Sequence, residues 1–295
     1  MVLRSRSALV GRQCRPTTLL SASTDRRCFL SAFFPFRYRL VAAGALLTVA
    51  VAAAACGSPS SAPDELAANQ QRLTQCVPAK PPAALVEVDG TGSSASDQIT
   101  EERMQTIESI ATRTAVCSGH LRVLVFSSSS AASATLFDGS LKMAGATDNA
   151  RLRRVPAAVA DLMAKVRAAY APAVAALPQN GSDITAQYRL ASEWVQQLGG
   201  LYRLNLTILT DGFQNVGVDL GAHPLGTQEA VALADKVAVP KLLGASVVVA
   251  GLGRIAKGTP SSAMVEGLVA YYDELCHRSS ATMCTSVTDY AEAGK

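Results

Sequence analysis

The chain is organised around Leu85-Val86-Glu87-Val88-Asp89-Gly90-Thr91-Gly92-Ser93-Ser94. Its first half is mostly apolar and β-branched, which is typical of a buried strand. The two glycines let the backbone turn sharply where that strand ends. We expect the turn to place the Asp89 carboxylate and the hydroxyls of Thr91 and Ser93 on one concave edge. Oxygen ligands of this kind suit a hard divalent cation.

Three other interpretations fit the same loop. Gly90 to Ala95 matches the dinucleotide-binding fingerprint G-x-G-x-x-A between a strand and a helix. That fingerprint needs an acidic residue at the end of the second strand, where this chain has a run of serines, Ser127 to Ser130. Glu87 to Thr91 also looks like the nucleophile loop of haloacid-dehalogenase-type phosphatases, but that family has aspartate at the position of Glu87. The third interpretation is a plain Gly-Ser turn with Asp89 as a helix cap.

The Asp89 loop resembles the first metal-binding loop of von Willebrand factor A (VWA) domains, whose form is Asp-x-Ser-x-Ser. Thr91 replaces the first serine and keeps the hydroxyl. The third metal loop of that family follows a strand and reads Thr-Asp-Gly. The same pattern ends Leu204-Asn205-Leu206-Thr207-Ile208-Leu209-Thr210-Asp211-Gly212, which makes Asp211 the second carboxylate. Taken alone, Asp211 would fit an ordinary Asp-Gly turn equally well.

A middle loop completes the resemblance. VWA domains have a Gly-Thr-Asp-like loop between the other two, and Asn180-Gly181-Ser182-Asp183-Ile184-Thr185 falls there. The matching hydroxyl is that of Ser182, with Asp183 and Thr185 as alternates. A dinucleotide site or a phosphatase does not predict this loop, so three loops in the expected order favour the metal site.

The resemblance covers about Ala83 to Leu275 and implies an α/β fold. We expect a mainly parallel, doubly wound, Rossmann-like sheet with helices on both faces and a shortened last unit. The cation site would consist of Asp89, Thr91, Ser93, Ser182 and Asp211, with water completing the coordination. Mg²⁺ is the expected ion, with Mn²⁺ or Ca²⁺ as alternatives. In the family, an acidic side chain of a protein partner supplies the missing oxygen.

The element pattern agrees with such a sheet. Further strands are expected at 121–126, 134–139 and 245–250, and helices at 97–116, 157–176, 186–198, 227–239 and 261–275. Pro172 should kink or end the second helix, and Pro240 should stop the fourth. An enzyme is not expected, because His120, His223 and His277 have no obvious metal-ligand or nucleophile partner by spacing and no G-x-S-x-G elbow occurs. The alternative function is a nucleotide- or phosphate-handling enzyme that uses Gly90 to Ser94.

The first 55 residues predict export. Leu40 to Ala55 is an apolar run of 16 residues after Arg37 and Arg39, shorter than the roughly 20 residues of a spanning helix. Ala53-Ala54-Ala55-Cys56 resembles a bacterial lipobox, which implies cleavage before Cys56 and lipid attachment to its sulfur; an uncleaved membrane anchor is the alternative. Arg26-Arg27-Cys28-Phe29-Leu30 resembles a twin-arginine motif. We therefore expect a leader at 1–55, a lipidated tether at 56–75, and a VWA-like domain at 76–295 on the extracytoplasmic face of the cell membrane.

Charge and cysteine usage agree with export. The whole chain has 27 basic and 23 acidic residues, but residues 1–55 hold eight arginines and one aspartate. The remainder therefore has 19 basic and 22 acidic residues, a net charge of −3, which gives no basic footprint for nucleic acid. Four cysteines remain after the leader and Cys56, an even number that favours disulfides. Three pairings are open, and sequence proximity favours Cys276 with Cys284 and therefore Cys76 with Cys117.

Overall fold

Six strands form one sheet in the order β3-β2-β1-β4-β5-β6 in the computed structural model, which describes residues 62–295. The strands are β1 (Pro82–Asp89), β2 (His120–Phe126), β3 (Ser133–Ser140), β4 (Arg203–Leu209), β5 (Ser246–Ala250) and β6 (Met283–Val287). All neighbouring pairs are parallel except β2 and β3, which are antiparallel. β1 lies in the middle and is buried along its whole length, so the stretch that contains Asp89 is the centre of the fold.

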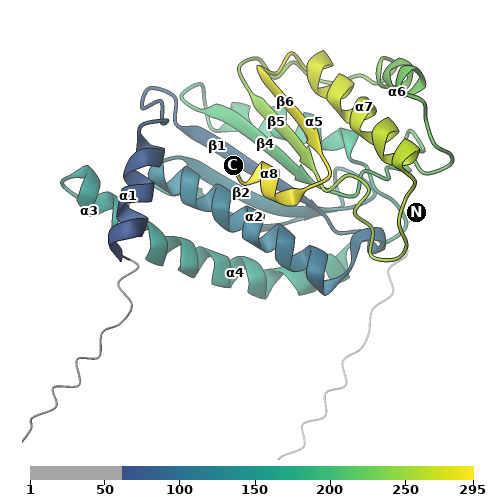
Figure 1. Cartoon of the computed structure of the whole chain (residues 1–295). Coiled ribbons are helices and arrows are strands. Elements are labelled where there is room, and N and C mark those ends of the chain that lie inside the picture. The colour runs from purple at the N-terminus through teal and green to yellow at the C-terminus, as the bar shows by residue number, and fades with distance from the viewer. Residues whose placement is uncertain (1–61) are drawn as a thin grey trace, which may run out of the picture. The chain divides into compact units, whose positions relative to one another are not determined.

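Helices cover both faces of the sheet (Figure 1). One face packs against α5 (Thr185–Gln197), α6 (Thr227–Ala234) and α7 (Ser262–Arg278). The other face packs against α2 (Asp97–Val116), α4 (Val155–Ala176) and α8 (Tyr290–Ala293), with α1 (Ala62–Leu73) beside them. The short α3 (Asp148–Leu152) and the 3₁₀ turn η1 (Gly92–Ser94) complete the set of described helices. The expected mainly parallel, doubly wound α/β sheet is therefore confirmed.

The last unit is shortened, as expected. β6 has five residues and α8 has four, and both lie after α7, where the sequence pattern left little room for a full strand and helix. The edge strand β3 runs antiparallel to β2 and is more exposed than the central strands. An exposed antiparallel edge is common on an otherwise parallel sheet. The predicted strand at 134–139 therefore exists and extends by one residue at each end.

The folded part begins before the predicted domain start at residue 76. α1 lies inside the stretch 56–75 that the Ser- and Pro-rich composition predicted to be a tether. Leu66 and Leu73 pack against the core beside α2, and Asn69 is buried. Most residues between these positions are polar or alanine, so the composition of the segment did not indicate a helix that packs on the core. The leader, Cys56 and the first part of the tether lie outside the described residues.

Two helix ends differ from the sequence prediction. α4 continues through Pro172 to Ala176. Pro172 is exposed near the end of that helix. The carbonyl group of Ala168, which loses its hydrogen bond to the proline, belongs to an exposed residue, so the helix can continue without burying an unpaired polar group. α6 ends at Ala234, before the predicted stop at Pro240, and turns at Lys236 and Val237 follow it.

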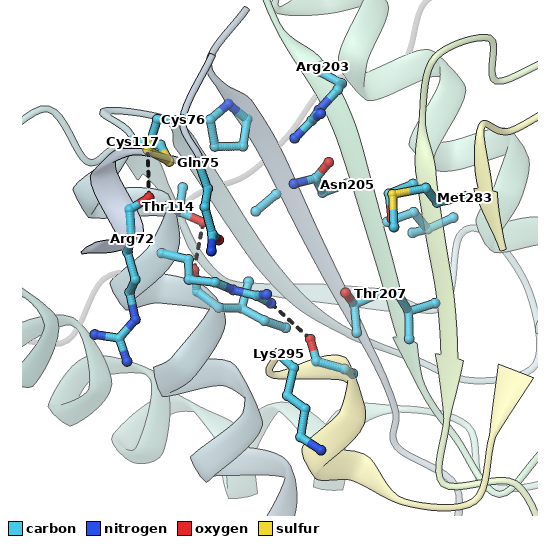
Figure 2. Close-up of a pocket in the computed structure, with 18 of the residues that line it drawn as sticks. Arg72, Gln75, Cys76, Thr114, Cys117, Arg203, Asn205, Thr207, Met283 and Lys295 are labelled. Atoms are coloured by element: carbon cyan, nitrogen blue, oxygen red, sulfur yellow. Dashed lines mark hydrogen bonds between the residues drawn. A yellow bond between two sulfur atoms is a disulfide. The ribbon is translucent and has the colours of Figure 1, made fainter. Parts of the chain in front are cut away.

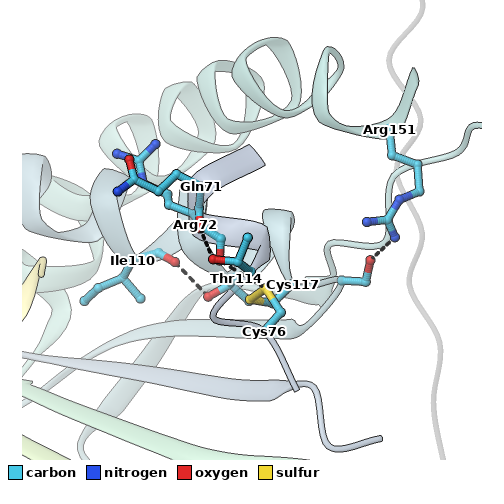
Figure 3. Close-up of a disulfide and its surroundings, with 9 residues drawn as sticks. Gln71, Arg72, Cys76, Ile110, Thr114, Cys117 and Arg151 are labelled. Atoms are coloured by element: carbon cyan, nitrogen blue, oxygen red, sulfur yellow. Dashed lines mark hydrogen bonds between the residues drawn. A yellow bond between two sulfur atoms is a disulfide. The ribbon is translucent and has the colours of Figure 1, made fainter. Parts of the chain in front are cut away.

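Both expected disulfides form. Cys76–Cys117 ties the segment after α1 to the end of α2 (Figure 2, Figure 3), across 41 residues of sequence. Cys276–Cys284 closes eight residues between α7 and β6. Each bridge lies near the edge of the sheet where strands begin, since Cys76 precedes β1 and Cys284 is the second residue of β6. Among residues 62–295, no helix is both long enough and apolar enough to cross a membrane.

Candidate functional site

Parallel pairing brings the two Asp-containing loops together. β1 pairs with β4 in a register that sets Val88 opposite Leu209, so Asp89 and the Thr210-Asp211 pair leave the sheet side by side. Two hydrogen bonds hold the middle loop against the end of β2 and against the segment that follows Asp211. The Asp183 amide donates to the carbonyl oxygen of Ser127 at 2.9 Å, and the Ser182 amide donates to Oδ1 of Asn215 at 2.8 Å. Three loops far apart in sequence therefore meet at the carboxyl ends of adjacent strands.

The Asp89 carboxylate is the centre of this meeting point. It is fully buried and accepts four hydrogen bonds. Its Oδ1 accepts from the Thr91 amide at 3.0 Å and the Thr91 hydroxyl at 2.7 Å. Its Oδ2 accepts from the Ser182 hydroxyl at 3.0 Å and the Thr210 hydroxyl at 2.7 Å. Each of the three loops thus contributes at least one donor to the same carboxylate.

Asp211 and Ser93 are the remaining predicted ligands near the Asp89 carboxylate. The Ser93 hydroxyl lies 3.3 Å from that of Thr91. One Asp211 oxygen accepts from the Phe213 amide at 3.0 Å, whereas the other, Oδ2, is buried with no hydrogen-bond partner among residues 62–295. Burial, and then the nearby charge of Asp89, raise the pKa of Asp211 to about 6. Two carboxylates buried so close together are electrostatically unfavourable unless a positive charge compensates them.

The residues present fit a hard divalent cation. Asp89, Asp211, Thr91, Ser93 and Ser182 offer only oxygen atoms, the ligands that Mg²⁺, Mn²⁺ and Ca²⁺ prefer. The partnerless Oδ2 of Asp211 is the atom that most needs such an ion. No group of three or more His, Cys, Asp or Glu side chains that could hold a metal occurs between residues 62 and 295. A site here would depend on two carboxylates together with hydroxyls.

Asp183 and Thr185, the alternative ligands in the middle loop, make other contacts. Oδ1 of Asp183 accepts from the Ala186 amide at 3.1 Å, so Asp183 caps the start of α5. The Thr185 amide donates to Gln214 Oε1 at 2.8 Å. The hydroxyl of this loop that reaches Asp89 is therefore the one on Ser182, as the resemblance implied.

Sequence reasoning missed Thr210. Its hydroxyl makes one of the two shortest contacts to Asp89 and also accepts from the Gly212 amide at 3.0 Å. The Thr-Asp-Gly pattern of this loop contains the threonine, but the sequence prediction gave a ligand role only to the aspartate. Gly212 has φ +85°, a left-handed conformation that favours glycine, and an added Cβ would lie 2.6 Å from Leu252. The Asp-Gly pair is thus required both for the turn and for packing.

Arg103 of α2 supports the Asp89 loop from beneath. It is almost fully buried and donates to the Asp89 carbonyl oxygen and the Ser94 hydroxyl, each at 2.9 Å. Its Nε donates to the Tyr290 hydroxyl at 3.2 Å, and its guanidinium lies over the Tyr290 ring. A buried arginine inside an amphipathic helix gave no sequence signal, because its partners are up to 187 residues away.

The site opens outward onto a shallow hollow of about 550 Å³. Thr91, Ser93 and Ser182 form its floor, and Gln179, Asn180 and Asn215 belong to its walls. Phe213 and Ala222 add apolar surface to this lining, and Asp219 is the one acidic residue in it. The proposed cation would therefore lie at the base of an accessible surface of hydrogen-bonding groups.

A doubly wound sheet that carries three hydroxyl- and carboxylate-bearing loops on one edge is the arrangement that the VWA resemblance implies. The domain is VWA-like. Within this VWA-like domain, Asp89, Thr91, Ser182 and Thr210 are directly hydrogen-bonded, and Ser93 and Asp211 lie beside them. The three loops are brought together by the fold.

Comparison with solved structures gives distant similarities. Proximal thread matrix protein 1 from the mussel byssus aligns over 73% of this chain and 45% of its own, with 13% identity and a TM-score of 0.34. The pilus adhesin SpaC from Lactobacillus rhamnosus GG, in its open conformation, aligns over 72% and 28%, with 13% identity and a TM-score of 0.37. The chain thus spans less than half of either protein, and nothing about function follows from alignments this distant. No family model and no curated protein matches the sequence.

Proposed function

We propose that this VWA-like domain binds a divalent cation, with Mg²⁺ as the expected ion, and captures a protein partner through it. Asp89, Thr91, Ser93, Ser182 and Asp211 would hold the ion. The observation that carries the proposal is the convergence of three loops on the buried Asp89 carboxylate, next to a second buried carboxylate with a partnerless oxygen. The ion would add to the positive charge of the buried Arg103 and bind the carboxylate oxygens directly.

The partner would be a protein that offers an acidic side chain. The cation would face this hollow, whose lining contains no basic side chain, so an incoming carboxylate would interact mainly with the ion. Such a surface binds through the metal and needs no nucleophile or general base. We therefore propose an adhesion-type module rather than an enzyme.

The chain would be held on the extracytoplasmic face of the membrane by a lipid on Cys56. The lipobox-like Ala53-Ala54-Ala55-Cys56 supports this part of the proposal, and the two disulfides agree with an oxidising compartment. Metabolic labelling with an alkyne fatty acid should tag the full chain and should not tag Cys56→Ser. Equal labelling of the two forms would contradict anchoring through Cys56.

Metal binding is tested by thermal unfolding of the full chain. In Mg²⁺ or Mn²⁺ the unfolding midpoint should rise above its value in EDTA, because an ion that binds only the folded state stabilises it. At an ion concentration of about 100 times Kd the gain would be about 2.7 kcal/mol. Asp211→Asn keeps the shape of the side chain, removes one of the two charges, and should abolish most of the shift.

Asp161→Asn is the matched control, because Asp161 is an exposed carboxylate on α4, away from the three loops. Its metal-dependent shift should equal that of the unaltered chain. If the unaltered chain shows no shift with Mg²⁺, Mn²⁺ or Ca²⁺, the cation site does not exist. An equal shift in Asp211→Asn would place metal binding elsewhere.

The nucleotide or phosphate alternative is less well supported. The glycine-rich loop forms the 3₁₀ turn η1, and α2 begins only at Asp97, after the N-cap Ser96. A phosphate seated on this loop would also approach the buried carboxylates Asp89 and Asp211. Like charges at that distance repel, so an anion is disfavoured where a cation is favoured.

A further inference from the structure

A second hollow, of about 310 Å³, lies on the sheet face that α2 and α8 cover, near the starts of β4, β5 and β6 (Figure 2). On this face α2 packs on β1 and β2, α4 packs on β2 and β3, and the four-residue α8 packs on β5. Because α8 is so short, side chains of β4 to β6 remain open toward α1 and α2. The hollow is separate from the Asp89 site, which lies at the opposite ends of the strands.

Three arginines, Arg72, Arg113 and Arg203, line this hollow, and none of them pairs with a carboxylate of a described residue. Arg203, the first residue of β4, directs its guanidinium into the space (Figure 2) and forms no ion pair with a described residue. Arg113 reaches across from α2 and donates to the carbonyl oxygen of Ala293 at 3.1 Å. Glu292, the acidic residue on this wall, lies 2.5 Å from the Lys295 ammonium instead.

The positive charge here is poorly compensated. Arg113 is half-buried, and both its burial and the charge of the neighbouring Arg72 lower its pKa. Arg72 itself donates to the Asn69 side chain, a neutral group, at 3.0 Å. An anion between these helices and β4 would relieve this repulsion.

The sheet supplies hydrogen-bonding groups and an apolar floor. Arg203, Asn205 and Thr207 alternate along β4, so their side chains share one face. Oδ1 of Asn205 is buried and has no hydrogen-bond partner among the described residues. The amide can be turned over, which would present its NH₂ group to an anion. Ile110 and Val248 provide apolar surface beside these groups.

We propose that this hollow binds a small organic anion. Its charged head, a carboxylate or a phosphate ester, would lie between Arg113, Arg203 and Asn205, and a short apolar body would contact Ile110 and Val248. The volume suits a small molecule, since ligand pockets are typically about 300–1,000 Å³. The mixed lining requires both parts of the ligand, because apolar surface alone would leave the arginines without a counter-charge.

Isothermal titration of the full chain tests the proposal. The Cys56→Ser form is used, so that no attached lipid competes with the probe. Octanoate and octyl phosphate should bind, and octanol, which has the same apolar body without charge, should bind at least about tenfold more weakly. Arg113→Gln should weaken octanoate binding about tenfold. Arg203→Gln, at the exposed rim, should weaken it about threefold, because solvent screens its charge.

Arg189→Gln is the control, because Arg189 is an exposed arginine of α5 that pairs with Glu193 on the opposite face of the sheet. Its affinity for octanoate should be unchanged. Arg203 makes no ion pair in the described structure, so Arg203→Gln remains informative if Arg113→Gln does not fold. Equal binding of octanol and octanoate, or unchanged affinity in Arg203→Gln, would overturn the proposal. Binding only to phosphatidylglycerol vesicles, with none to soluble octanoate, would also overturn it.

Discussion

The two ends of the sheet differ in how their polar side chains are held. At the carboxyl ends of β1 and β4, Asp89 is buried and accepts four hydrogen bonds from three loops. Near the starts of β4 to β6, Arg203 and Asn205 face an open hollow and form no side-chain hydrogen bonds among the described residues. The first region is acidic and interlocked, and the second is basic and open. A substitution should therefore affect stability at the first end and ligand binding at the second.

Asp89→Ala is the substitution expected to change the free energy of unfolding most. It removes the shared acceptor and leaves the hydroxyls of Ser182 and Thr210 buried without it, so we expect a loss of about 4 kcal/mol in the free energy of unfolding. Urea unfolding in EDTA measures the loss without any metal contribution.

Arg203→Ala gives the matching measurement at the other end. Because Arg203 is exposed and makes no ion pair in the described structure, we expect a change within about 0.5 kcal/mol. The comparison fails if the two substitutions cost the same, or if Asp89→Ala costs less than about 1 kcal/mol.

The two disulfides test the comparison between the two ends of the sheet further, because both lie at the end that carries the basic hollow. Replacing Cys76 and Cys117 together by serine should cost about 4 kcal/mol, since the bridge spans 41 residues in the unfolded chain. Replacing Cys276 and Cys284 should cost about 2.5 kcal/mol, because that loop spans eight. Chemical unfolding of both double variants measures the difference. The reverse order would show that native packing, rather than loop closure, sets the effect.

An effect smaller than those of Asp89 and the disulfides is expected at Glu87, which shares β1 with Asp89. Unlike that of Asp89, its carboxylate is buried without a hydrogen-bond partner in the described part of the chain. Burial raises the pKa of Glu87 well above the usual range despite the charge of Arg122. A raised folded-state pKa means that stability falls as pH rises above the unfolded value of about 4.3. Glu87→Gln removes this penalty and should stabilise the protein by about 1–2 kcal/mol at pH 8.

The gain from Glu87→Gln should shrink strongly by pH 4 and disappear near pH 3, where the carboxyl group is neutral in both the folded and the unfolded states. Unfolding measured across this pH range gives the profile. Glu101→Gln is the control, because Glu101 pairs with Arg167 on the surface and gains nothing from losing its charge. A gain that is the same at pH 4 and pH 8 would show that charge burial is not the cause.

The elements near the site were predictable because their signals are local. The apolar run before Asp89 predicts β1, and apolar residues at helical spacing predict α2 over 97–116. α1 and the uninterrupted course of α4 past Pro172 were not predictable in the same way. The first depends on a narrow stripe that packs against distant residues, and the second on the exposed position of the proline.

The sequence alone placed the oxygen-bearing residues Asp89, Thr91, Ser93 and Asp211 directly after two strands, because short turns fix which polar groups follow a strand, and the VWA resemblance added Ser182 as a predicted ligand. It also indicated the disulfide partners, through their number and spacing. Only the tertiary structure decided that Thr210 and Ser182 share one carboxylate oxygen, that Arg103 supports the loop from below, and that a basic hollow remains open at the other end. Those relations join residues up to 121 positions apart at Asp89, and no local pattern records which strands become neighbours.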